Sequence, residues 1–335
     1  VTCSNRPGKF TYVANLYSDR VSAFLIDNAS GNLTPISGSP FTTANRPISV
    51  ATHPSGKFLY VAHSDAITPI SAYTIDASTG SISLIATYDN SGAANYVTLD
   101  SQGRFLYLAD STGYVVAYAI NQATGALTFV GSYTAGTTPT AVTVDPSSRY
   151  VYVYSQGSND ISAYSINSVT GALTWIANYV AGSGGYSLTI DQTGSYLYSA
   201  SVRNGQNIQA YSINATTGVL SFIAGYGNSS YTDYVAINPT GEFLYNVDAS
   251  NVLAYSRNQA TGALTLIGTY VTGGSGGNAI AIDPLNKYAY IPNKGSNYIG
   301  DVSVMIIDES TGALTASTPV ASGDYNTSIA IAIEQ

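Results

Sequence analysis

Charge is the scarcest feature of this sequence. Only 9% of its 335 residues are charged, and 11 Lys and Arg against 19 Asp and Glu give a formal net charge of −8. Nucleic acid is bound by clustered basic side chains that neutralise phosphates, whereas the basic residues here are scattered singly. The composition therefore argues against a nucleic-acid partner.

Cysteine is almost absent, since Cys3 is the only one in the sequence. A single thiol excludes an internal disulfide framework and any zinc site built from cysteines. Cys3 lies in a lead-in segment, residues 1–6, that belongs to none of the repeats described below. Lipidation, a free thiol and a bridge to another chain all remain open for it.

Long hydrophobic runs are also missing. No stretch of 18 apolar residues occurs, so we expect no membrane-spanning helix. The chain begins with Val rather than Met, which is consistent with a mature or trimmed protein whose targeting segment is missing. Few lysines, scarce thiols and many small polar residues favour an extracellular or cell-surface location, with the periplasm as a further option.

What the sequence does contain is one unit repeated seven times. Each copy carries a Thr-Gly or Ser-Gly step followed by a small or polar residue and an aliphatic one, at a spacing of 44 to 50 residues. A fixed period of this size is the signature of a repeat architecture. The seven glycines are Gly31, Gly80, Gly125, Gly171, Gly218, Gly262 and Gly312.

The second copy shows what one unit forms. Four short segments of alternating or β-branched residues, 49–52, 58–62, 70–75 and 82–88, are separated by clusters of Gly, Pro, Asp and Ser. Such segments are typical of strands and hairpins, and no helical period is present. Seven four-stranded units predict an all-β fold, a single seven-bladed β-propeller of antiparallel blades.

The two ends of the chain predict how the ring closes. The first copy begins at a second strand, residues 9–14, and the last residues, 329–334, have the pattern of the missing first strand. We therefore expect the C-terminal strand to complete the N-terminal blade, in one propeller domain over residues 7–335. A linear solenoid would instead need polar caps.

Comparison of the copies separates constant turns from one variable face. Variable positions on a constant scaffold are where a specific site is built. At the end of the second strand the copies carry Asn15, His63, Asp110, Ser155, Ser201, Asp248 and Asn293. Around the start of the first strand they carry Arg46, Asn95, Tyr96, Thr140, Tyr186, Asp233, Tyr234 and Asn278. We predict a ligand-binding face that includes Arg46, His63, Tyr96, Asp110, Tyr186, Asp233, Tyr234 and Asn278. The alternative is that these residues only end strands and bond to water or nearby backbone.

The amino-acid sequence of the repeats resembles that of a known family. Residues 54–62, 12–15 and 290–297, with the hairpin 258–265, are similar to the seven-bladed lactonase-type propellers. That family includes bacterial 6-phosphogluconolactonase and the fungal carboxymuconate-lactonising enzymes. The repeat sequence also resembles the YVTN repeats of microbial surface proteins. The resemblance covers practically the whole chain and implies the same fold.

The residues that the resemblance would require for catalysis are not found. Lactonase-type enzymes place a His facing the channel in the first strand of some blades. The positions matched to it here, none of them His, are Ser49, Tyr96, Ala141, Ser187, Tyr234, Ala279 and Ala330. Glu242, Glu309 and Glu334 fall in a turn, an outer hairpin and a strand end, where no general base is needed.

Other chemistries leave few candidates. Two histidines in different repeat positions do not supply the three protein ligands usual for catalytic zinc, and no calcium-loop spacing occurs, so we expect no metal and no cofactor. The sequence favours a non-catalytic binding or structural scaffold for a carbohydrate, a protein or copies of itself. The alternative is a lactone hydrolase in which Arg46 holds a carboxylate and His63 or Asp233 moves the proton.

Overall fold

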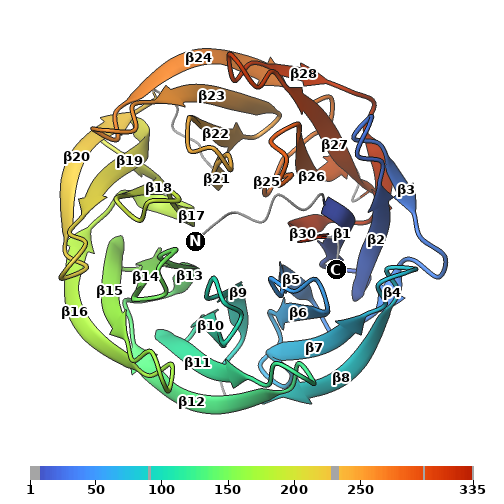
Figure 1. Cartoon of the computed structure of the whole chain (residues 1–335), viewed down its shortest axis with the longest axis horizontal. Coiled ribbons are helices and arrows are strands. Elements are labelled where there is room, and N and C mark those ends of the chain that lie inside the picture. Colours follow the sequence, from blue (N-terminus) through green and yellow to red (C-terminus); the bar gives the residue numbers. More distant parts are fainter. Residues whose placement is uncertain (1–7, 90–91, 228–233, 297–298, 334–335) are drawn as a thin grey trace.

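The computed structural model describes residues 8–89, 92–227, 234–296 and 299–333. Within these ranges the strands form seven antiparallel sheets that stand around a central axis as the blades of a propeller (Figure 1). The predicted all-β, seven-bladed architecture is confirmed. In the same ranges no helix is long and apolar enough to cross a membrane.

Five blades are regular four-stranded meanders whose first strand lies nearest the axis (Figure 1). Blade 2 contains β5 (Pro47–Thr52), β6 (Phe58–His63), β7 (Ile70–Ile75) and β8 (Ile82–Tyr88). Blade 3 contains β9 (Ala94–Leu99), β10 (Phe105–Asp110), β11 (Tyr114–Ile120) and β12 (Leu127–Thr134). Blade 4 contains β13 (Pro139–Val144), β14 (Tyr150–Ser155), β15 (Asp160–Ile166) and β16 (Leu173–Val180). Blade 5 contains β17 (Ser183–Ile190), β18 (Tyr196–Arg203), β19 (Gln206–Ile213) and β20 (Leu220–Tyr226). Blade 6 contains β21 (Tyr234–Ile237), β22 (Phe243–Asp248), β23 (Asn251–Arg257) and β24 (Leu264–Val271).

In the two remaining blades the outer strand is split into two short pieces that pair with the same third strand. Blade 7 contains β25 (Ala281–Ile282), β26 (Tyr288–Ser296), β27 (Ile299–Ile307), β28 (Leu314–Ala316) and β29 (Val320–Gly323). Blade 1 contains β1 (Gly8–Asn15), β2 (Arg20–Ile26), β3 (Leu33–Pro35), β4 (Phe41–Thr42) and β30 (Asn326–Ile333).

The ring closes in blade 1 as the two ends of the sequence predict. The C-terminal strand β30 pairs antiparallel with β1, so strands from both ends of the chain share one sheet. The register corrects one assignment. Ser328 lies opposite Ala14 in the same way that Ser49 lies opposite Ala62. Ser328, not Ala330, is therefore the residue of blade 1 that corresponds to Ser49 in the first strand of blade 2.

A repeated contact between neighbouring blades explains why tyrosine and the Thr-Gly step recur together. In blades 1 to 6 the tyrosine in the middle of the second strand donates its hydroxyl to the hairpin glycine of the next blade, as Tyr60 does to the Gly125 carbonyl at 3.0 Å. The glycine has a positive φ, and a Cβ on Gly125 would lie 2.4 Å from the Phe58 ring. The same bond joins Tyr12 to Gly80, Tyr107 to Gly171, Tyr152 to Gly218, Tyr198 to Gly262 and Tyr245 to Gly312.

Candidate functional site

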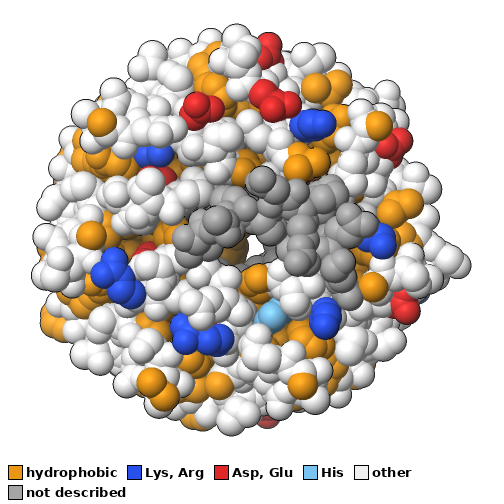
Figure 2. Space-filling view, in the orientation of Figure 1, with side chains coloured by type: hydrophobic (Ala, Val, Ile, Leu, Met, Phe, Trp, Pro, Cys, Tyr) orange, Lys and Arg blue, Asp and Glu red, His pale blue; other side chains and the backbone are white. Residues whose placement is uncertain are grey.

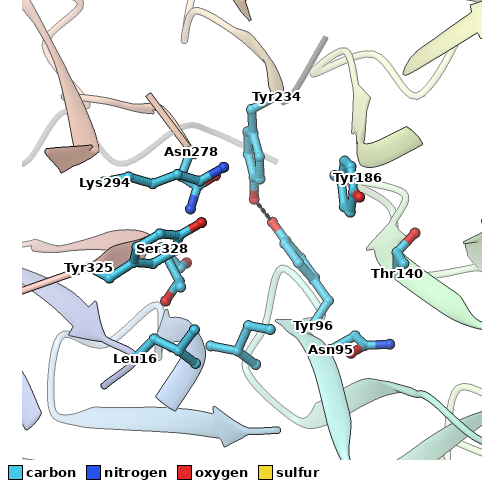
Figure 3. Close-up of a pocket in the computed structure, with 12 residues that line it drawn as sticks. Leu16, Asn95, Tyr96, Thr140, Tyr186, Tyr234, Asn278, Lys294, Tyr325 and Ser328 are labelled. Atoms are coloured by element: carbon cyan, nitrogen blue, oxygen red, sulfur yellow. Dashed lines mark hydrogen bonds between the residues drawn. The ribbon is translucent and has the colours of Figure 1, made fainter. Parts of the chain in front are cut away.

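A cavity of about 370 Å³ lies where the first strands of the blades begin. Side chains from all seven blades line it, so it sits on the propeller axis, and we call it the axial pocket (Figure 3). Its lining residues are Leu16, Ile48, Asn95, Tyr96, Thr140, Tyr186, Tyr234, Asn278, Lys294, Tyr325, Thr327 and Ser328.

β-Bulges aim several of these side chains at the axis. The pairing of β9 with β10 shifts between Tyr96, opposite Ala109, and Ala94, opposite Asp110, which leaves Asn95 as the extra residue. A bulge adds one residue to a strand and turns its side chain away from the regular alternation. Equivalent shifts fall at Ile48, Thr140 and Thr327 in blades 2, 4 and 1, and a longer one in blade 5 includes Tyr186.

The bulged residues also lock the rim of the pocket. Asn95 Nδ2 donates to the Pro139 carbonyl at 2.7 Å, and Thr140 Oγ1 donates to the Gly185 carbonyl at 3.0 Å. Each bond runs from one blade to the next, as do those from Asn278 to the Asn326 carbonyl and from Thr327 to the Pro47 carbonyl. Each of these bonds uses one N–H of the side-chain amide. The Asn95 and Asn278 side chains therefore keep a second N–H donor and a carbonyl acceptor for a ligand. The rim is therefore pre-organised.

Two tyrosines meet across the axis. Tyr96 comes from blade 3 and Tyr234 from blade 6, and their hydroxyls are hydrogen-bonded to each other (Figure 3). The ring centroids are 6.2 Å apart. Burial raises the pKa of both hydroxyls, and the neighbouring Tyr96 raises that of Tyr234 further, so the pair stays protonated. One hydroxyl donates to the other, which leaves the second proton for a ligand.

Lys294 is the single charged residue among the lining residues. It follows Asn293 within β26, is half-buried, and holds its Nζ 5.6 Å from the centroid of the Tyr325 ring. A cation beside an aromatic face in a partly desolvated site is well placed to attract an oxyanion or a carboxylate. The axial pocket is thus neutral and polar with one positive group.

The residues at the ends of the second strands do not reach this pocket. His63 is fully buried and its Nε2 lies 3.0 Å from Ser71 Oγ in the neighbouring strand, while Asp110 is 2% exposed. Asp110 accepts bonds from the Gly92 and Thr112 amides, both at 2.8 Å, and so shapes its own loop. At His63 and Asp110 the side chains bond to local groups at the end of a strand.

The predicted face is therefore divided. Tyr96, Tyr186, Tyr234 and Asn278 line the axial pocket, whereas Arg46 lines a separate groove and His63 lies inside a blade. His63 pairs with Pro47, the residue after Arg46, but its side chain is fully buried. Asp233, Cys3 and Glu334 lie outside the described residues.

Lys294, Tyr325, Leu16 and Ser328 were not predicted from the sequence. Ser328 could have been found by exact alignment of the repeats, since it occupies the position of Ser49. Lys294 stands one residue beyond a position that the repeats mark as variable, and it carries no signal of its own. No group of three or more His, Cys, Asp or Glu side chains that could hold a metal occurs in the described part of the chain.

The burial of His63 leads to a prediction about acid stability. Desolvation lowers the pKa of His63 from 6.5 to about 4. Between these values the unfolded chain binds a proton that the folded chain does not, so stability is lost as the pH falls from about 6.5 to about 4. Asparagine occupies the same position in blades 1 and 7, so His63→Asn is a conservative test. Between pH 7 and pH 4.5 we expect the free energy of unfolding of this variant to fall by about 2 kcal/mol less than that of wild type.

Urea denaturation of both proteins at the two pH values measures this difference. Equal pH dependence of the two proteins would show that His63 does not titrate in this range. His53 is a built-in reference, because it stays in both proteins with its Nε2 3.0 Å from the Gly103 carbonyl and a pKa also lowered by burial.

Charged groups on the face drawn in Figure 2 are separated by neutral and apolar side chains. The family described as the seven-bladed β-propeller lactonases matches residues 4–98, 86–190, 132–232 and 192–328. A search of curated protein sequences finds no match.

Solved structures share the fold at low sequence identity. A candidate 6-phosphogluconolactonase from Bacteroides fragilis superposes with a TM-score of 0.84 at 20% identity, covering 99% of both chains. A second candidate 6-phosphogluconolactonase, from Bacteroides uniformis, gives 0.84 at 18% identity over 97% of this chain and 99% of that one. A periplasmic gluconolactonase from Pseudomonas aeruginosa gives 0.83 at 15% identity over 97% and 99%.

Proposed function

Because the chain belongs to the lactonase family of seven-bladed β-propellers, we propose that it hydrolyses a small lactone in the axial pocket. The observation that carries the proposal is the placement of Lys294 and the Tyr96–Tyr234 pair in one cavity on the axis. These groups supply a positive charge and a hydroxyl proton to the same space.

The chemistry follows from where charge develops. Water adds to the lactone carbonyl carbon, the carbonyl oxygen becomes an oxyanion, and the ring C–O bond then breaks to give a hydroxy acid. Donors fixed in a partly dry site stabilise such an oxyanion more than water does. Lys294 and the free proton of the tyrosine pair are the donors that we assign to this role. The described residues that line the pocket include no carboxylate or imidazole, so we assign no general base among them.

The charge of the pocket limits the substrate. One ammonium group and no acidic side chain suit a neutral lactone or one with a single negative charge. A phosphorylated lactone carries close to two negative charges and would call for more basic groups. We therefore favour an unphosphorylated sugar lactone. An extracellular or periplasmic location is part of the proposal, supported by the low charge content and by the periplasmic Pseudomonas protein of the same fold.

The test is hydrolysis of sugar, acyl and muconate lactones by the purified chain, followed by pH-stat. We expect turnover above the buffer rate. The Tyr96→Phe, Tyr234→Phe double variant keeps the ring packing and removes both hydroxyls, and it should be slower by roughly tenfold, the loss for one neutral hydrogen bond. Tyr114→Phe, at an exposed position on β11, is the matched control and should match wild type.

A non-catalytic scaffold is the second candidate function. The lack of a carboxylate or imidazole among the lining residues favours it, since a pocket of this kind can bind a carbohydrate or a protein segment without reaction. Self-association belongs to the same class of function. No turnover with any lactone, together with binding of an unreactive sugar in the axial pocket, would favour the scaffold.

A further inference from the structure

A second hollow lies beside the axial pocket and takes no part in the chemistry proposed above. It is an open groove of about 460 Å³ between blades 1 and 2, built from the loops that follow β1 and β6 and from the residues before β5. The lining residues of this groove are Leu16, Tyr17, Asp19, Asn45, Arg46, Ser64, Asp65 and Ala66.

The polar groups of the groove are held in place by their own contacts. Asn45 Nδ2 donates to Asp65 Oδ2 at 3.0 Å, and the Ile67 amide donates to Asp65 Oδ1 at 3.0 Å. The Arg46 amide donates to Asp19 Oδ1 at 2.7 Å. The bond from the Ile67 amide, with that from Asn45, lowers the pKa of Asp65, so this carboxylate is charged at neutral pH. In the described part of the chain the Arg46 guanidinium forms no ion pair.

The groove and the axial pocket adjoin at Leu16 and at the Tyr17–Tyr325 pair. Leu16 lines both, and its amide donates to the Tyr325 carbonyl at 2.9 Å. The Tyr17 ring, on the groove side, packs against the Tyr325 ring, on the pocket side, with centroids 5.2 Å apart and an interplanar angle of 61°. Lys294 lies over Tyr325 within the pocket. The groove therefore begins where the lining of the pocket ends, at Leu16.

The chemistry of the groove fits a neutral, hydroxylated ring. Two carboxylates and an amide accept or donate to pairs of hydroxyls, and a planar guanidinium donates to them in a fork. The Tyr17 ring, 56% exposed, offers an apolar face with a polar tip. A phosphate or carboxylate on the ligand would meet Asp19 and Asp65 beside Arg46, and this repulsion offsets the attraction of the single cation.

We propose that the groove is a subsite for a neutral sugar residue attached to the lactone that occupies the axial pocket. The preferred substrates are then lactones of disaccharide aldonic acids rather than of monosaccharide ones. This inference rests on the proposed lactone hydrolysis for its kinetic form, but the groove as a sugar site can be measured without turnover.

The kinetic experiment compares glucono-1,5-lactone with cellobiono-1,5-lactone and maltobiono-1,5-lactone, so that two linkages are sampled. We expect kcat/KM to be at least about tenfold higher for one of the disaccharide lactones, as one well-placed sugar subsite supplies. Arg46→Met and Asp65→Asn should bring the ratio of disaccharide to monosaccharide kcat/KM close to one. Arg20→Met, an exposed arginine on β2 outside the groove, should leave the ratio at its wild-type value.

A binding experiment separates failure of this inference from failure of the proposed function. Ligand-observed NMR with cellobiose and maltose should show binding to wild type and to Arg20→Met, and at least tenfold weaker binding to Arg46→Met. If no lactone is hydrolysed but this binding pattern holds, the groove is a sugar site and the lactonase proposal fails. If lactones are hydrolysed with no disaccharide preference, or neither disaccharide binds, the groove inference is overturned.

Discussion

Replacement of Asp191 by alanine is expected to lower the free energy of unfolding by about 4 kcal/mol, more than any other single substitution considered for this protein. Asp191 follows β17 in blade 5 and is fully buried, and its Oδ2 lies 3.4 Å from Nη2 of the buried Arg257 at the end of β23 in blade 6. Removal of the carboxylate leaves a guanidinium inside the protein whose remaining partners include the Gly241 carbonyl and the Tyr196 ring.

The opposite substitution should cost far less. In most other blades an isoleucine stands where blade 6 has Arg257, for example Ile166 and Ile213. Asp191 keeps its bonds from the Ser195 and Tyr196 amides, both at 2.8 Å, when the arginine is absent. We therefore expect Arg257→Ile to change stability by less than about 1.5 kcal/mol, because the carboxylate keeps the amide bonds that also hold Asp145 in the same turn of blade 4.

Guanidinium chloride denaturation of these variants separates the two contributions. Asp145→Ala is the matched control, since Asp145 binds the Arg149 and Tyr150 amides in the same turn of blade 4 with no buried cation opposite. The extra loss in the free energy of unfolding of Asp191→Ala over Asp145→Ala measures the cost of the unpaired guanidinium. The double variant Asp191→Ala, Arg257→Ile should regain this extra loss. Equal losses for Asp191→Ala and Asp145→Ala would contradict the prediction.

The Lys294→Met variant is expected to lower kcat for lactone hydrolysis by about 100-fold, within the range found when one oxyanion donor is removed. Lys294 is the one positive group among the described residues that line the axial pocket, and methionine keeps most of the stem that packs beside Tyr325. The loss should fall on kcat more than on KM, because the charge interacts most strongly with the oxyanion of the transition state.

Two further variants show whether the loss comes from charge. Lys294→Arg keeps the positive charge and should recover part of the rate. Lys57→Met removes an exposed lysine from the turn between β5 and β6, which does not line the pocket, and should be as active as wild type. A Lys294→Met variant with unchanged kcat would mean that the oxyanion is stabilised elsewhere.

The fold was predictable from the sequence because each repeat contains the local signals for its own strands and turns. Alternating strands, the Pro-containing turns and the Thr-Gly hairpin are local signals, and seven copies of them repeat one sheet seven times. The incomplete first copy and the final strand pattern were enough to predict the closure of blade 1 by β30. In that strand the sequence alignment matched Ala330 to Ser49, whereas the structure matches Ser328, two residues earlier. Small residues such as these give no signal of strand register.

The division of the variable residues could not be predicted in the same way. His63 and Tyr96 are both polar residues at variable positions of the repeat, yet one is buried in a blade wall and the other reaches the axis. His63 ends the second strand of its blade, whereas Tyr96 lies on the first strand, which is nearest the axis. Bulges such as the one at Asn95 turn further side chains towards the pocket, and no residue type marks where they occur.

The sequence by itself therefore determined the number of blades, the order of their strands and the way the ring closes, because these follow from local patterning. Only the tertiary structure decided which side chains share a space. Tyr96 and Tyr234 are 138 residues apart and meet because their blades stand on opposite sides of the axis. Lys294 and Tyr17 lie on the two sides of Tyr325 for the same reason: the closed ring brings distant repeats to one point.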